Sequence, residues 1–214
     1  MPSPVASNAA VLRLQDLSFG YPGHALFQQL SVDFPAGLSL VQGGDGAGKT
    51  SLMCLLAGGR APQAGSVALH GADSVRDAVR YRAQVFWRDP RAPWPERLTA
   101  QAWADELAAL YQRYSGVQWQ AHVAGFGLAP HLHKPMYQLS AGSQRKVLLA
   151  AALASGATLT LLDEPVAALD NPSIAYLLQA LEAEAGTPPW PGRVLIIAHY
   201  DALGDLPWRR TLVL

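Results

Sequence analysis

The sequence predicts an α/β domain with a mainly parallel β-sheet covered by helices. Three short runs of almost uninterrupted apolar residues, 38–41, 159–162 and 194–197, are typical of strands that are buried on both faces. Segments with the apolar spacing of helices alternate with these runs. A glycine-rich stretch also joins the first run directly to an apolar helix. Alternation of strand and helix favours a parallel sheet between layers of helices.

The strands ahead of and between these runs are shorter or more polar. Residues 11–14 and 30–34 alternate between apolar and polar side chains, as half-buried strands do. Residues 66–70 form another short strand between two glycines, and residues 85–87 end a further one. We expect residues 1–10 to form a loose tail.

The second half of the chain is richer in helices. A proline-dense loop covers residues 89–95, and a helix-rich subdomain is expected from about residue 87 to 155 beside a core of residues 11–86 and 156–214. Together they would make a single domain of 214 residues. The apolar spacing predicts helices over 99–114, 117–126, 141–154 and 173–184.

Composition narrows the possible classes of function. The formal net charge is zero, so the basic surplus typical of nucleic-acid-binding proteins is missing and no nucleic-acid partner is expected. The single cysteine, Cys54, excludes an internal disulfide framework and fits a reducing compartment. The N-terminus has neither a basic segment nor an apolar one, unlike a signal peptide. The longest apolar region, 147–162, divides into a helix and a strand, so we expect a chain that is soluble by itself.

Residues 43–50 read Gly-Gly-Asp-Gly-Ala-Gly-Lys-Thr and match the phosphate-binding pattern G-x-x-x-x-G-K-[ST]. Glycines let the backbone N–H groups turn toward phosphate oxygens, and the start of the next helix adds a partial positive charge. Lys49 would reach the β- and γ-phosphates, and the Thr50 hydroxyl would bind Mg²⁺. The pattern therefore predicts binding of ATP or GTP. The residues of this predicted phosphate site are Gly43, Gly44, Asp45, Gly46, Ala47, Gly48, Lys49, Thr50 and Ser51.

Two carboxylates and a histidine follow the buried strands. Asp163 and Glu164 end the strand 159–162, and His199 ends the strand that starts at Val194. Ligands of parallel sheets bind at the carboxyl ends of strands, where the phosphate loop also begins. We expect Asp163 to bind Mg²⁺, Glu164 to activate the attacking water, and His199 to contact that water or the γ-phosphate. A structural His at a strand end is the alternative.

Residues 139–146, Leu-Ser-Ala-Gly-Ser-Gln-Arg-Lys, precede a long apolar helix. Ser140 is a good N-cap residue, and Gly142 permits close approach of another backbone. A helix N-terminus of this kind can bind an anion. Taken alone, the segment would be interpreted as a capped helix without a ligand.

Taken in order, these motifs resemble the ATP-binding cassette family of transporter ATPases from about Leu14 to the C-terminus. The matching motifs are an aromatic at Tyr21, the Walker A loop 43–50, an LSGGQ-like signature at 139–143, the Walker B end 159–164, a D-loop-like segment 168–170 and the switch histidine His199. The resemblance implies the fold of that family's ATPases: a P-loop core with a mainly parallel sheet, an N-terminal antiparallel part and a helical subdomain.

The same resemblance implies an ATPase that works as a head-to-tail dimer with two ATP molecules at the interface. Tyr21 would stack on adenine, Ser140 and Gly142 would contact the γ-phosphate bound by the other copy, and Asp170 would help to couple the two sites. Transmembrane permease subunits would be separate chains. The protein would lie in the cytoplasm, on the inner face of the membrane.

Two departures from the family pattern stand out. The signature has Ala141 in place of a glycine and Ser143 in place of a glutamine, and a methyl group at Ala141 would be crowded if that position needed a positive φ. The glutamine expected after the strand ending near Phe86 is replaced by Arg88. A cation does not ligate Mg²⁺, so we expect Arg88 to pair with a phosphate or with a partner's carboxylate.

Three alternatives stay open beside the transporter interpretation. A non-transport ATPase of DNA repair or translation is one, and a non-catalytic nucleotide-gated scaffold, suggested by Arg88, is another. Within the transporter class, the short chain and the LSAG-type signature look like the haem-exporter subunits of cytochrome c maturation. Trp94, between two prolines, either anchors a partner or pins its own loop.

Overall fold

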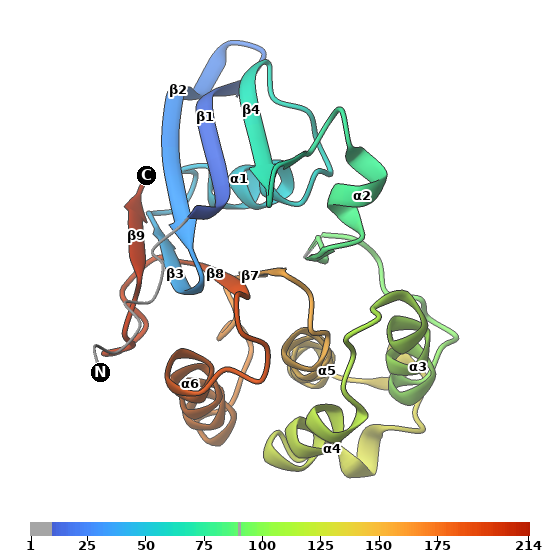
Figure 1. Ribbon diagram of the computed structural model, residues 1–214. Helices are drawn as coiled ribbons and strands as arrows, with labels where there is room; N and C mark the ends of the chain where they lie inside the picture. The colour runs from blue at the N-terminus through green and yellow to red at the C-terminus, as the bar shows by residue number, and fades with distance from the viewer. Residues whose placement is uncertain (1–9, 90) are drawn as a thin grey trace, which may run out of the picture.

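The computed structural model describes residues 10–89 and 91–214, and the helices and strands alternate as the sequence predicts (Figure 1). Most of the expected tail, residues 1–9, lies outside the described part, as does Pro90. The strands are β1 (Ala10–Tyr21), β2 (His24–Pro35), β3 (Gly37–Gln42), β4 (Ala64–Leu69), β5 (Ala72–Asp73), β6 (Val85–Phe86), β7 (Leu159–Asp163), β8 (Val194–His199) and β9 (Arg210–Val213). The α-helices are α1 (Lys49–Leu56), α2 (Ala78–Arg82), α3 (Ala100–Leu110), α4 (Gly116–Gly125), α5 (Ala141–Ala154) and α6 (Asn171–Gly186), with 3₁₀ turns η1 (Ala129–His131) and η2 (Met136–Gln138).

A five-stranded sheet in the order β6-β7-β8-β3-β9 forms the centre of the molecule. Each pair of neighbours in it is parallel. The register sets Gln42 beside His199 and Asp163 beside Ala198. The carboxyl ends of β3, β7 and β8 therefore meet at one edge, and the phosphate loop begins there.

The central strands are buried on both faces, which explains their continuous apolar sequences. In β8, Val194, Ile196 and Ala198 face one core, while Leu195 and Ile197 face the other. This alternation is the period of two that a strand imposes on its side chains. Because neither face meets water, polar alternation is absent from these segments.

The first core lies between the parallel sheet, helix α1 and a second, antiparallel sheet with the order β2-β1-β4-β5. Figure 1 shows this antiparallel sheet above α1, with the parallel strands below it. The second core lies on the opposite face, where α3, α4 and α6 surround α5. Residues 147–154 of α5 are all buried, so the second half of this helix is enclosed on all sides, while its first turn is exposed or half-buried. None of the described helices combines the length and apolarity needed to cross a bilayer.

The fold class predicted from the sequence is confirmed, with differences in the bounds of elements. Helix α5 begins and ends where predicted, whereas the helix expected over 99–114 runs only from Ala100 to Leu110. Tyr111 leaves the helical conformation, and its hydroxyl donates a hydrogen bond to the Val85 carbonyl. The alternating segments 11–14 and 30–34 are parts of two 12-residue strands paired as a hairpin. Elements α2, β5 and β9 were not predicted.

Candidate functional site

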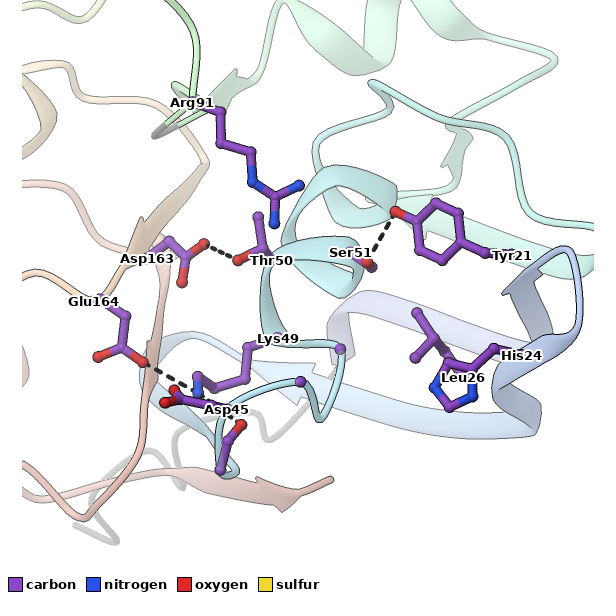
Figure 2. Close-up of a pocket in the computed structure, with 13 residues that line it drawn as sticks. Tyr21, His24, Leu26, Asp45, Lys49, Thr50, Ser51, Arg91, Asp163 and Glu164 are labelled. Atoms are coloured by element: carbon purple, nitrogen blue, oxygen red, sulfur yellow. Dashed lines mark hydrogen bonds and ion pairs between the residues drawn. The ribbon is translucent and has the colours of Figure 1, made fainter.

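The phosphate loop joins the end of β3 to the start of α1, as the motif predicts (Figure 2). Gly46 and Gly48 have positive φ values of 79° and 99°, a region that side chains with a Cβ rarely adopt. A Cβ at Gly48 would also lie only 3.0 Å from the Phe27 ring. The positive φ values favour glycine at both positions, and the Phe27 ring leaves little room for a Cβ at Gly48. The resulting turn leaves the first N–H groups of α1 facing the pocket.

Lys49 is the first residue of α1, and its side chain is only 7% exposed. Its ammonium group donates to the carbonyl oxygens of Gly43 at 2.7 Å and Gly44 at 3.1 Å. It also forms an ion pair with Glu164, at 3.1 Å between Nζ and Oε1 (Figure 2). These three contacts hold the positive charge of Lys49 at the loop 43–50, beside the pocket.

Thr50 and Asp163 form an oxygen-rich pair beside the loop. The Thr50 hydroxyl donates to Asp163 Oδ2 at 2.6 Å, while Asp163 Oδ1 is buried without a hydrogen-bond partner. Burial raises the pKa of the Asp163 carboxyl, although the hydrogen bond from Thr50 and the charges of Lys49 and Arg145 act in the opposite direction. An unpartnered buried carboxylate oxygen next to a hydroxyl is a suitable ligand set for a hard cation such as Mg²⁺.

Glu164 extends from the carboxyl end of β7 toward the same pocket. Its backbone has a φ of 45°, and its N–H donates to the Ala198 carbonyl at 2.9 Å. Strained backbone of this kind at the end of a strand often positions a functional side chain. The carboxylate is one-third exposed and lies between Lys49 and His199, with 3.6 Å from Oε2 to Nε2 of the histidine. The Glu164 carboxylate can therefore meet solvent in the pocket between these two side chains.

His199 is 2% exposed at the end of β8. Its ring contacts Asp201, a residue that sequence reasoning missed. Its Nδ1 lies 2.8 Å from Asp201 Oδ1, which also accepts the Leu203 N–H at 3.0 Å. This contact assigns the proton to Nδ1, where it is donated to the carboxylate. Nε2 then faces Glu164 and has no hydrogen-bond partner within the described chain.

A pocket of about 380 Å³ connects Lys49, Thr50, Asp163 and Glu164 to the antiparallel sheet, whereas His199 does not line it. Tyr21 lies at its far end, 42% exposed, with its hydroxyl 3.2 Å from the Ser51 hydroxyl (Figure 2). Most of the predicted phosphate-site residues line the pocket; Gly43 and Ala47 complete the loop without doing so. Sequence reasoning missed three lining residues, His24, Leu26 and Arg91.

The signature segment lies outside this pocket and meets solvent at Ser140 and Ala141, while Leu139 is buried. Ser140 caps helix α5 by accepting the Ser143 N–H at 3.1 Å, and both Ser140 and Ala141 are exposed. Ala141 begins the helix and is not among the residues with positive φ, so its methyl group is not crowded in the way the sequence suggested. Gly142 packs so closely on the Ala168 backbone that a Cβ would lie 2.6 Å from the Ala168 oxygen.

Asp170 is exposed and also lies away from the pocket. It caps α6 by accepting the Ser173 N–H at 2.9 Å, and its other oxygen lies 2.7 Å from the Lys146 ammonium. The hydrogen bond from Lys146, together with those from Ser173, holds the pKa of this carboxyl well below its usual range. Asp170 thus links the N-terminal turn of α6 to the signature helix α5.

Arg88 does not contact the pocket in this structure. Its guanidinium donates to the backbone oxygens of Asp89 and Ala92 and lies 3.8 Å from the centre of the Trp94 ring. Trp94 in turn meets Trp103 edge to face, with 5.2 Å between ring centres. Of the two interpretations left open for Trp94, these contacts favour the one in which the ring pins its own loop.

Comparison with known proteins identifies the family of the chain. The family model described as "ABC transporter" matches residues 27–167, which cover most of the chain and include the phosphate loop, the signature and the Walker B carboxylates. The chain belongs to the ABC transporter family. The resemblance read from the motifs is thereby confirmed, and the chain is an ATP-binding ATPase subunit of this class.

Two curated relatives of this family are each 35% identical to the chain. The cytochrome c biogenesis ATP-binding export protein CcmA of Pseudomonas putida matches over 82% of this chain and 82% of its own length. The taurine import ATP-binding protein TauB of Pseudomonas entomophila matches over 75% of this chain and 63% of its own, so the chain spans less than two thirds of that relative. A bacterial ABC transporter cassette solved as a dimer shares the fold, with a TM-score of 0.73 at 18% identity over 89% of this chain and 88% of its own.

Proposed function

We propose that this subunit binds Mg²⁺-ATP in the 380 Å³ pocket and hydrolyses it by in-line attack of water on the γ-phosphate. The observation that carries the proposal is the meeting of Lys49, Thr50, Asp163, Glu164 and His199 at one sheet edge, although they come from three separate segments. The N–H groups of the loop and of the first turn of α1 surround the phosphates. Tyr21, at the other end of the pocket, supplies a flat face for adenine.

Mg²⁺, when bound, would neutralise charge on the β- and γ-phosphates. Thr50 and Asp163 would hold it, because one carboxylate oxygen is unpartnered and the hydroxyl lies beside the other. Lys49 is paired with Glu164 in this structure, and nucleotide binding would exchange that partner for phosphate oxygens. The exchange leaves the Glu164 carboxylate free to accept a proton from the attacking water.

His199 would orient the same water or a γ-phosphate oxygen. Its ring is buried, its Nδ1 is fixed by Asp201, and Nε2 is directed toward Glu164 at 3.6 Å. A ring held in this way loses little freedom when it meets the substrate, which is the advantage of a preorganised site. Glu164 and His199 together therefore act on the nucleophile, and Lys49 acts on the phosphate that it attacks.

We further propose that two copies of the chain assemble head to tail around two ATP molecules. Ser140 and Gly142 would complete the partner's site, because the signature segment is exposed and lines no part of its own pocket. Asp170, held by Lys146 of the signature helix, would connect the two sites. A cassette of the same fold that has been solved as a dimer supports assembly of two copies.

ATP-driven closure of this dimer would move separate transmembrane permease subunits, and the protein would sit at the cytoplasmic face of the membrane. The relatives' names support a transporter role over an ATPase of DNA repair or translation. Because CcmA and TauB are equally identical to the chain but one is named an export protein and the other a taurine import protein, the proposal stops at the transporter class. A cytochrome c maturation exporter is the second candidate, favoured by the longer match to CcmA.

Steady-state ATPase activity tests the catalytic part of the proposal. Glu164→Gln should lower turnover by about 100-fold or more while ATP still binds, because general-base catalysis contributes roughly 10²–10⁴-fold. Glu182→Gln, an exposed carboxylate on α6, is the matched control and should behave as wild type. Unchanged turnover in Glu164→Gln would refute the assigned role. Loss of nucleotide binding would show instead that the carboxylate is needed to form the site.

A further inference from the structure

The segment after β6 forms a compact loop that is held together by its own side chains. Arg88 donates to the carbonyl oxygens of Asp89 at 3.0 Å and Ala92 at 2.9 Å, and its planar group covers the Trp94 ring. Trp94 rests against Trp103 of α3. Burial lowers the pKa of Arg88, yet a guanidinium stays charged under ordinary conditions. Arg88 therefore stabilises the loop and is not available to a ligand in the pocket.

The same loop directs a second arginine into the nucleotide pocket. The Arg91 N–H donates to Asp89 Oδ1 at 2.8 Å, and the Ala92 N–H donates to the Asp89 carbonyl at 3.0 Å. These two bonds fix the turn from which the Arg91 side chain extends. Arg91 lines the pocket, and Figure 2 shows its guanidinium reaching toward Thr50 from the side opposite the phosphate loop.

The positive charge of Arg91 indicates what this side chain could bind in the pocket. Among the described residues that line the pocket, Lys49 and Arg91 are the only lysine or arginine. Lys49 already has two carbonyl oxygens and the Glu164 carboxylate as partners, and all of them lie on the loop side or at the end of β7. A triphosphate entering the pocket would have Lys49 on one side. Arg91 supplies a cation from the other side.

The end of the pocket where Arg91 lies determines which phosphate it would meet. Tyr21 and His24 lie at the adenine end, whereas Asp163 and Glu164 lie at the end where hydrolysis takes place. Arg91 reaches toward Thr50, whose hydroxyl is bonded to Asp163. A nucleotide stretched between the two ends would place its terminal phosphate nearest to Arg91. The planar fork of a guanidinium matches two oxygens of a phosphate, which gives geometry as well as charge.

We propose that Arg91 binds the γ-phosphate of ATP and thereby makes the pocket discriminate ATP from ADP. The inference rests on the proposed function of the pocket and extends it to a residue outside the recognised motifs. It also assigns the phosphate contact that the sequence suggested for Arg88 to the arginine three residues later. Arg88 then acts as the support that shapes the loop.

Equilibrium binding of two probes, ATPγS and ADP, each with Mg²⁺, tests this inference by titration calorimetry. Arg91→Ala should weaken ATPγS binding by about 10-fold or more, since a charge-assisted hydrogen bond contributes roughly 1.5–3 kcal/mol. ADP binding should stay within about twofold of wild type. Arg91→Lys should recover part of the loss, because it restores the charge without the fork. Arg97→Ala, an exposed arginine further along the same segment, is the matched control and should leave both affinities unchanged.

The outcomes separate failure of this inference from failure of the proposed function. If wild type binds both probes and hydrolyses ATP but Arg91→Ala keeps the wild-type ratio of affinities, Arg91 does not contact the γ-phosphate. An equal loss for ATPγS and ADP would also overturn the inference, because it would place the contact on a phosphate that both nucleotides share. If wild type binds neither probe, the proposed function itself fails.

Discussion

The close contact between the signature helix and the D-loop backbone predicts that Gly142→Ala destabilises the subunit. A methyl group at Gly142 would lie 2.6 Å from the Ala168 carbonyl oxygen, whereas ordinary van der Waals contact begins at 3.4 Å. The obstacle is backbone and not the end of a flexible side chain. Ala168 itself has a φ of 63°, so the segment that would have to move is already in an uncommon conformation.

The size of the effect follows from two opposing contributions. Overpacking of this kind costs about 1–3 kcal/mol. Replacing a helical glycine by alanine returns roughly 0.5–1 kcal/mol through the lower entropy of the unfolded chain. Because the obstacle is backbone, we take an overpacking cost of about 2–3 kcal/mol, and the net loss should be about 1–2 kcal/mol. For a chain of this length each kcal/mol shifts Tm by roughly 2–4 °C, so thermal unfolding should occur about 2–8 °C lower.

Gly116→Ala is the matched control for the backbone contribution. Gly116 is the first residue of α4, and a Cβ there would meet no atom within 4 Å. This variant should melt at or slightly above the wild-type temperature, as monitored by circular dichroism. ATPase activity should fall in Gly142→Ala alone, since the exposed signature helix is the proposed contact for the partner's ATP. Equal Tm values for wild type and Gly142→Ala, with full activity, would refute the reasoning.

Two further predictions concern Asp201, which follows β8, and His122 on α4. Asp201→Asn should lower kcat about 3–10-fold with little change in KM, because it weakens the partially exposed contact that orients His199. The control Asp205→Asn should leave kcat unchanged. A change in KM alone for Asp201→Asn would contradict this positioning role. Burial, with a smaller contribution from Arg193, lowers the pKa of His122 to about 4, against about 6.5 in an unfolded chain. The unfolded state therefore binds the extra proton, so the free energy of unfolding should fall as pH drops from 6.5 toward 4, by up to roughly 3 kcal/mol. Urea unfolding of His122→Gln should show a correspondingly flatter pH dependence, and identical slopes in both proteins would exclude His122 as the source.

The sequence predicted those elements whose signal is local. Strand β8 is a continuous apolar run, and α5 has a capping serine at its start, so both could be placed without knowledge of the rest of the chain. Elements α2, β5 and β9 have at most five residues each. Short segments of this kind depend on neighbouring strands and helices for their stability, so the pattern of their own residues does not predict them.

In the candidate site, too, residues in contiguous motifs could be predicted and residues placed by loop conformation could not. Lys49 and Thr50 belong to a contiguous motif that follows a buried strand, so their meeting with the Walker B carboxylates could be predicted because the carboxyl ends of parallel strands share one edge. Asp201 and Arg91 act through the conformation of loops, and sequence does not say in which direction a loop side chain points. Arg88 illustrates the point, because an aromatic ring and two carbonyl oxygens hold it where the sequence suggested a phosphate or carboxylate partner.

The mass of the subunit in the presence of nucleotide tests the central claim most directly. Glu164→Gln should bind ATP without consuming it, so the proposed closed dimer should accumulate. Sedimentation velocity with Mg²⁺-ATP should then give about twice the 22.8 kDa of one chain, and the same protein with ADP should return to the single-chain mass. A variant that is saturated with ATP and still sediments as one chain would contradict the account.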